Sequence, residues 1–92
     1  MSPSEALAAG TTGIVAVTGY LFVIDGEARL CELIAESFPP QCGGPNVSVQ
    51  NHEQLAIGPL ETEQGISWSN EPVTLFGQMS DGVLIGDPNA AG

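Results

Sequence analysis

Two cysteines and one histidine are the side chains of this sequence with the widest choice of chemistry. Cys31 and Cys42 are separated by ten residues, and His52 follows Cys42 after nine more. Prolines and glycines force the chain to turn in this stretch, which favours a disulfide bond between the two cysteines. Such a bond stabilises a small domain by restricting its unfolded chain, and it indicates an oxidising compartment. We therefore expect an extracytoplasmic protein, secreted or membrane-anchored through a removed N-terminal segment.

The same side chains leave two alternatives open. Cys31 and Cys42 could stay as free buried thiols, or they could act with His52 in a metal-binding or redox protein. Redox pairs usually have the closer spacing Cys-x-x-Cys, which lowers the pKa of one thiol. A zinc ion takes about four ligands, and these three side chains do not supply four. The disulfide is the interpretation that the spacing favours.

No set of residues forms a recognisable catalytic group. His52 is a candidate general base, but a general base also needs a nucleophile or an orienting carboxylate. Glu53 is adjacent to it in the chain and is expected to point elsewhere. Ser48, Ser67 and Ser69 are hydroxyl groups without a nucleophile motif. We expect no enzyme, no catalytic residues, no cofactor and no metal.

Charge excludes some partners. Eleven Asp and Glu residues accompany a single Arg and no Lys, which gives a formal net charge of −10. Nucleic acids are bound through many Lys and Arg contacts with phosphates, so no nucleic-acid binding is expected. Anionic membrane surfaces are disfavoured for the same reason. The carboxylates of Glu53, Glu61 and Glu63 lack the regular spacing of a calcium loop and are expected to be solvated.

Arg29 and Tyr20 are the candidates for a ligand-binding face. Arg29 is the only Lys or Arg, and we expect it to pair with a nearby carboxylate of Glu27, Glu32 or Glu36. Its alternative role is to anchor an anionic ligand. Tyr20 is the aromatic residue expected to face a ligand. Core packing is expected for Phe22, Trp68 and Phe76, and Phe38 is expected to cover one end of the fold.

Alternation of apolar residues predicts five strands. They cover residues 14–24, 28–33, 46–50, 73–79 and 83–85. Asp25-Gly26 and Ser80-Asp81-Gly82 are hairpin turn signals. A helical turn is expected at 33–37, and residues 51–69 are expected to be a partly ordered loop with at most a helical turn.

A bend in the first strand decides the expected fold. Gly19 lies in the middle of this strand, where glycine often marks a bulge or bend. A bent first strand that pairs with both neighbours predicts an all-β, five-stranded, OB-like Greek-key barrel. The alternative is an open β-sandwich. The expected organisation is a flexible N-terminal tether (1–13), one β-barrel domain (14–87) and a C-terminal tail (88–92). No apolar run is long enough for a transmembrane helix, so no membrane insertion is expected.

Four segments resemble a group of small uncharacterised actinobacterial proteins, extracytoplasmic and lipoprotein-like, over roughly residues 15–84. These segments are Val17-Thr-Gly-Tyr-Leu-Phe-Val, Arg29-Leu-Cys-Glu, Ser37-Phe-Pro-Pro-Gln-Cys-Gly-Gly and Val73-Thr-Leu-Phe-Gly with Asp81-Gly-Val-Leu. The resemblance implies a fold and a compartment but no activity. With the residues, it leads us to expect a non-enzymatic binding or structural domain for a protein or small envelope ligand. The alternative is the metal-binding or redox protein described above.

Overall fold

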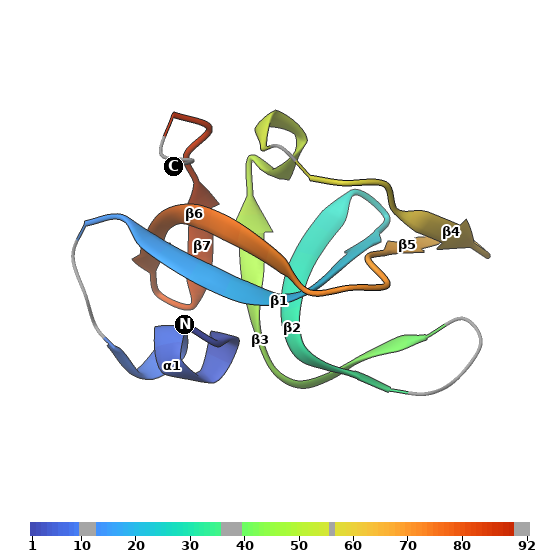
Figure 1. Cartoon of the computed structure of the whole chain (residues 1–92), viewed down its shortest axis with the longest axis horizontal. Coiled ribbons are helices and arrows are strands. Elements are labelled where there is room, and N and C mark those ends of the chain that lie inside the picture. Colours follow the sequence, from blue (N-terminus) through green and yellow to red (C-terminus); the bar gives the residue numbers. More distant parts are fainter. Residues whose placement is uncertain (10–12, 36–39, 56, 90–92) are drawn as a thin grey trace.

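The computed structural model describes residues 1–9, 13–35, 40–55 and 57–89. These residues form a mostly β domain with one short helix (Figure 1). Its elements in chain order are α1 (Pro3–Ala9), β1 (Val15–Ile24), β2 (Glu27–Ala35), β3 (Gln41–Gln50), the 3-10 turn η1 (His52–Gln54), β4 (Glu61–Glu63), β5 (Ile66–Trp68), β6 (Val73–Ser80) and β7 (Val83–Gly86).

Five of the strands close into a ring of hydrogen-bonded neighbours. The ring runs β1–β2–β3–β7–β6 and returns to β1. The β3–β7 pair is parallel and the other ring pairs are antiparallel. β4 and β5 extend the sheet from β1, so the described chain forms a seven-stranded mixed sheet rather than the expected five strands.

The bend of β1 at Gly19 allows the ring to close. Residues from Val15 to Gly19 pair with β6, and residues from Tyr20 to Ile24 pair with β2. A Cβ atom on Gly19 would lie 2.6 Å from the backbone oxygen of Cys31, so only glycine fits here without a shift. The expectation that the first strand pairs with both neighbours, on either side of Gly19, is confirmed.

Three hairpins turn through the same backbone conformation. Asp25-Gly26, Gln64-Gly65 and Asp81-Gly82 all have positive φ at both positions. This is the type I′ conformation, whose twist matches that of the flanking strands, and glycine adopts it at no steric cost. The first and third turns were expected from the sequence, and the second was not.

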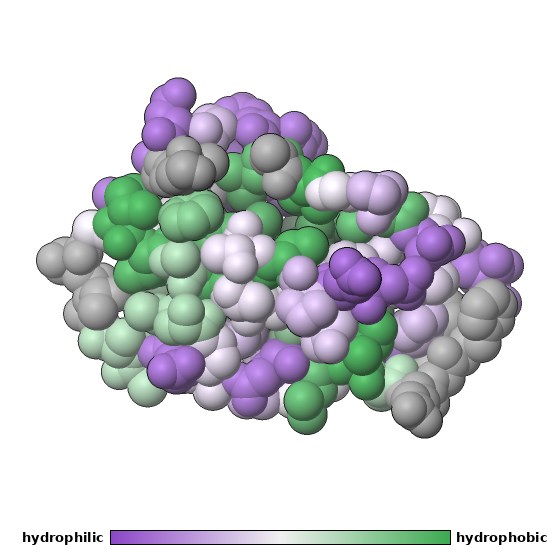
Figure 2. Space-filling view, in the orientation of Figure 1, coloured by the Kyte–Doolittle hydropathy of each residue, from purple (hydrophilic) through white to green (hydrophobic). Residues whose placement is uncertain are grey.

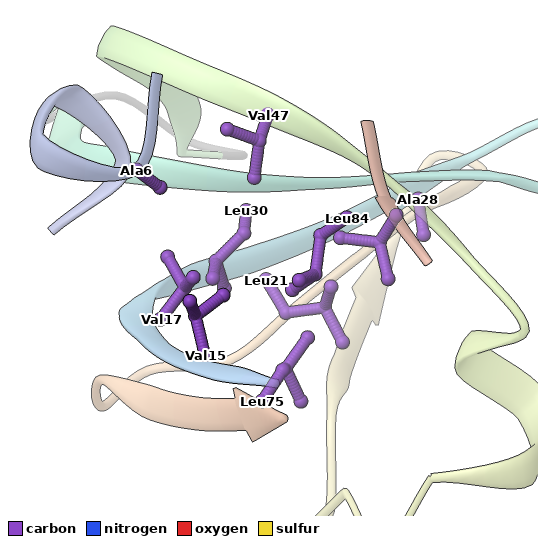
Figure 3. Close-up of a cluster of buried hydrophobic side chains, with 10 residues drawn as sticks. Ala6, Val15, Val17, Leu21, Ala28, Leu30, Val47, Leu75 and Leu84 are labelled. Carbon is purple, nitrogen blue, oxygen red and sulfur yellow. The ribbon is translucent and has the colours of Figure 1, made fainter. Parts of the chain in front are cut away.

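The interior of the ring is a core of aliphatic side chains (Figure 3). Val17, Leu21, Leu30, Val47 and Leu84 are fully buried and come from β1, β2, β3 and β7. In β1, Val17 and Leu21 point inward, whereas Thr18 and Tyr20 point to the opposite face. The apolar residues that alternate along a strand therefore indicate which side of the strand faces the core.

The segment before β1 contains α1, which packs on the ring. Its start is a capping box: the Ser2 N–H donates to Glu5 Oε1 (2.9 Å), and the Glu5 N–H donates to Ser2 Oγ (3.2 Å). Pro3 and Ala6 are buried against the ring. Part of the expected tether is thus a packed helix in this structure, and the expected limits of the domain stay a prediction. No helix in the described ranges is both long and apolar enough to cross a membrane.

Three other segments differ from expectation. Residues from Leu33 to Ala35 belong to β2 rather than to a helical turn, because they pair with β3. β3 begins at Gln41 and not at 46. Its pairing with β2 has a register shift between Cys31 and Leu33 of β2. The expected loop 51–69 contains η1 and the β4–β5 hairpin, which is held to the sheet by pairing between β5 and β1.

Candidate functional site

The candidate site is the side of β1, β2 and β3 that faces away from the ring core, here called the outer face. Residues directly opposite each other on neighbouring strands point to the same face of a sheet. The register therefore places two rows of side chains across the outer face. The first row is Tyr20, Cys31 and Asn46, and the second is Phe22, Arg29 and Ser48. Tyr20 and Arg29, proposed from the sequence as a ligand face, thus share one side of the sheet.

The disulfide between Cys31 and Cys42 lies on this face, and the expectation of a disulfide is confirmed. The two Cα atoms are 5.6 Å apart, a common separation for a bridged pair. The bond joins β2 to β3 across the register shift between these strands. It encloses residues 36–39, so the expected position of Phe38 lies outside the described residues.

An aromatic cluster surrounds the disulfide. Phe22 and Trp68 are 2% and 4% exposed, and Cys31 is buried with them. Trp68 reaches Phe22 because β5 pairs with β1, and its Nε1–H donates to Asn70 Oδ1 at 2.8 Å. Tyr20 packs against the cluster and stays half-buried. The expected burial of Phe22 and Trp68 is confirmed, whereas Phe76 is only half-buried.

Arg29 is exposed on the outer face and bonds to a neutral side chain. Its Nη1 donates to Asn46 Oδ1 at 2.8 Å. Asn46 lies opposite Cys31, so the guanidinium leans away from Glu27, which lies on the other side of Arg29 along β2. The expected pairing with Glu32 is wrong, because Glu32 instead accepts hydrogen bonds from Ser4. Within the described ranges, Arg29 also forms no ion pair with Glu27. Glu36 lies outside the described residues, so its expected pairing with Arg29 stays a prediction.

Two shallow pockets meet at Arg29 and Glu27. The first, of 390 Å³, lies over β2, β3, the start of β7 and the β1–β2 turn. The second, of 290 Å³, lies between the same two charged residues and the edge of the aromatic cluster. The first is lined by Gly26, Glu27, Ala28, Arg29, Ser48, Val49, Gln50 and Val83, and the second by Phe22, Ile24, Asp25, Glu27, Arg29 and Cys42.

The structure does not bring His52 to the cysteines. His52 follows the end of β3 and Cys42 lies near its start, so extended geometry separates them by roughly 25 Å. His52 Nδ1 is 3.9 Å from Glu53 Oε1, contrary to the expectation that Glu53 points elsewhere. Within the described ranges, no three His, Cys, Asp or Glu side chains gather closely enough to hold a metal ion. Nothing in this arrangement adds to the metal-binding or redox alternative.

Hydrophilic side chains lie mainly away from the ring core. Figure 2 shows them in several separate regions of the visible face, including those over η1 and over the tip of the β4–β5 hairpin. Glu53 lies in the first region, and Glu61 and Glu63 lie in the second. All three carboxylates are exposed. They are therefore solvated charges distributed over the surface.

Asn46 and Ser48 complete the outer face, and sequence reasoning did not assign them to it. Both are half-buried and lie opposite β2, with Asn46 holding the guanidinium of Arg29. Ser69, unlike these two, is buried, and its role is clear. Its Oγ accepts a hydrogen bond from the Leu21 N–H at 2.9 Å and helps to fix β5 beside β1. These contacts depend on strand register, which the local sequence does not reveal.

The described residues therefore define a small, mostly β domain with one disulfide. No protein-family model, curated protein or solved structure matches the chain. The resemblance to actinobacterial proteins stays a prediction.

Proposed function

We propose that this protein is a non-enzymatic binding domain of an extracytoplasmic compartment, and that its outer face binds a protein or a small envelope ligand. The observation that carries this proposal is the position of Arg29. The only Lys or Arg of the chain is exposed on a sheet face, between two pockets and beside a buried aromatic cluster. Ligand sites commonly combine an apolar wall with a few polar groups that fix orientation.

The strand order supports an OB-like Greek-key barrel as the finer description of the ring. OB-folds are five-stranded, partly open barrels that bind ligands on the face of strands two and three, between two loops. In this chain the corresponding surface is β2 and β3, with the β1–β2 and β6–β7 turns beside it. The pocket of 390 Å³ lies there. The fold analogy supports only the location of binding, because one fold carries many functions.

The disulfide supports the extracytoplasmic location. Disulfides of this structural kind form and persist in oxidising compartments and are rare in the cytosol. The net charge supports the choice of partner, since a polyanion such as nucleic acid would meet ten excess negative charges.

Two lysine substitutions test the outer face. Ser48→Lys places a long side chain in the first pocket, whereas Gln78→Lys places the same side chain on an exposed position of β6. Both change the net charge equally. With each immobilised on resin and incubated with envelope extract, we expect ligand retention by wild type and Q78K and its loss in S48K. Equal retention by both variants would place the binding surface elsewhere.

A further inference from the structure

We propose that the 290 Å³ pocket beside Arg29 binds a small zwitterion with an apolar side chain, as found in apolar amino acids and short peptides. The inference rests on the proposed function, because it names a ligand class for the same outer face. The pocket combines three kinds of lining: one cation, two anions and an apolar wall. A free carboxylate, a free ammonium group and an apolar side chain would complement these three linings.

Arg29 supplies the site for the carboxylate. Its guanidinium has five N–H donors, and the hydrogen bond to Asn46 Oδ1 uses only one of them. Because Asn46 is neutral, this contact positions the guanidinium without cancelling its charge. Guanidinium groups bind carboxylates through two parallel hydrogen bonds, a geometry that a planar and partly immobilised side chain favours.

Asp25 and Glu27 supply the site for the ammonium group. Both are exposed at the β1–β2 turn and line the pocket together with Arg29. Neither belongs to an ion pair within the described part of the chain. A ligand with only a carboxylate would be repelled by these two side chains and by the net charge of −10. An added ammonium group removes that penalty, so the pocket favours a zwitterion over a simple anion.

Phe22, Ile24 and Cys42 supply the apolar wall. Phe22 is 2% exposed and lines the pocket, and the disulfide ties Cys42 to β2. Ile24 is 43% exposed, so a ligand side chain would remove apolar surface from water there. A wall held by a covalent bond costs little to order when a ligand binds.

The test uses three ligands that share the leucine side chain and differ in which charged terminal group they carry. L-leucine carries both charged groups, N-acetyl-leucine lacks the ammonium group and leucinamide lacks the carboxylate. Each is titrated into the whole protein while backbone amide resonances are followed by NMR. We expect leucine to shift resonances of the pocket residues with a dissociation constant on the order of 1 mM, as suits a shallow open site. Each blocked ligand should bind at least about fivefold more weakly, a difference of roughly 1 kcal/mol.

Three variants assign the two charges. Arg29→Gln should weaken leucine and N-acetyl-leucine but leave leucinamide unchanged. Glu27→Gln should weaken leucine and leucinamide. Glu71→Gln changes the net charge as Glu27→Gln does, but at an exposed residue outside this pocket. It should leave the affinity for all three ligands unchanged. A dispersed spectrum for each variant shows that it is folded.

Leucyl-leucine separates the two sources of the zwitterion. Tighter binding of the dipeptide supports short peptides, and tighter binding of leucine supports free amino acids. The proposal is overturned if leucine causes no shifts at 50 mM, or if R29Q binds it as well as wild type. It is also overturned if leucinamide equals leucine. If the leucine titration fails but S48K still abolishes the retention of envelope ligand, only the zwitterion proposal is wrong. If S48K also retains envelope ligand as well as wild type does, both proposals are wrong.

Discussion

The two buried clusters of this domain lie on opposite sides of the same strands and are built differently. The cluster inside the ring consists of aliphatic side chains from the ring strands and Ala6 from α1. The cluster on the outer face consists of Phe22, Trp68 and the disulfide, with partly exposed neighbours around them. The first is enclosed by the ring itself. The second depends on the β4–β5 hairpin and a covalent bond, and its neighbours are only partly buried.

This difference separates stability from function within a small chain. A small domain buries a limited share of its surface, so its stability relies on a core without gaps. The side chains around the outer cluster can stay partly exposed, because the disulfide and the β4–β5 hairpin hold the cluster in place. The pockets and Arg29 lie beside the outer cluster, where partly exposed apolar surface is available to a ligand.

Truncation of the inner cluster should have the largest effect. Leu30 is fully buried, and Leu30→Ala should reduce the free energy of unfolding by about 2–5 kcal/mol through lost burial and a residual cavity. Leu33 lies on the same strand but is 58% exposed, and Leu33→Ala should cost less than about 0.5 kcal/mol. Urea unfolding of both variants measures the difference. Similar losses would show that the ring interior is not the main source of stability.

Removal of the disulfide should have the next largest effect. A bond that encloses about ten residues contributes roughly 2–3 kcal/mol by restricting the unfolded chain. Dithiothreitol should therefore lower the urea midpoint of wild type and leave that of the Cys31→Ala, Cys42→Ala double variant unchanged. We expect Trp68 fluorescence to change in the reduced folded state, because Cys31 packs in its cluster. If dithiothreitol does not change the urea midpoint of wild type, the disulfide does not stabilise the fold.

Gly19 connects the two clusters, and its replacement should have an intermediate effect. The methyl group of Gly19→Ala would meet the Cys31 backbone oxygen at 2.6 Å, so strands β1 and β2 must shift. We expect a loss of about 1–3 kcal/mol in the free energy of unfolding. Gly58→Ala is the matched control, because its added methyl group would lie in open space and should change stability by less than about 1 kcal/mol. Equal values for both variants would contradict the close approach at Gly19.

Sequence reasoning succeeded where structure is local. Asp25-Gly26 and Asp81-Gly82 specify their turns directly, and the bend follows from a glycine within an apolar strand. The β4–β5 hairpin was missed because its strands are three residues long and are stabilised by pairing with β1. Helix α1 was missed although Ser2 to Glu5 has the pattern of a capping box. A seven-residue helix is unstable alone, so it requires burial against residues distant in the chain.

The candidate site shows the same limit. Placing Tyr20 and Arg29 together was possible because both belong to one hairpin. The partner of Arg29 was not predictable, because proximity along the chain suggested carboxylates and the β2–β3 register supplied Asn46. The pocket also needs Cys42, which reaches it through the pairing of β3 with β2 and the disulfide.

Acidification should have the smallest effect, and it should act on α1, the element that covers one end of the inner cluster. Hydrogen bonds from the Ser2 backbone and side chain lower the pKa of Glu5 below its usual 4.5. Hydrogen bonds from the Ser4 side chain and backbone lower the pKa of Glu32 below the same value. Because both pKa values are depressed in the folded state, the stabilisation is present above pH 4.5. It is lost as the pH falls from 4.5 through the folded pKa values.

The amide protons of α1 should therefore exchange faster with solvent below pH 4.5, after correction for the intrinsic pH dependence of exchange. Trp68 fluorescence should stay constant over the same interval, since the outer cluster contains neither carboxylate. Glu32→Gln should weaken the docking of α1 already at pH 7 and reduce its further loss in acid, and Glu71→Gln should behave as wild type. Unchanged α1 protection down to pH 2.5 would mean that apolar contacts of Pro3 and Ala6 alone hold the helix. At the end of the inner cluster that α1 covers, apolar packing would then be the main stabilising interaction, as it is within the ring.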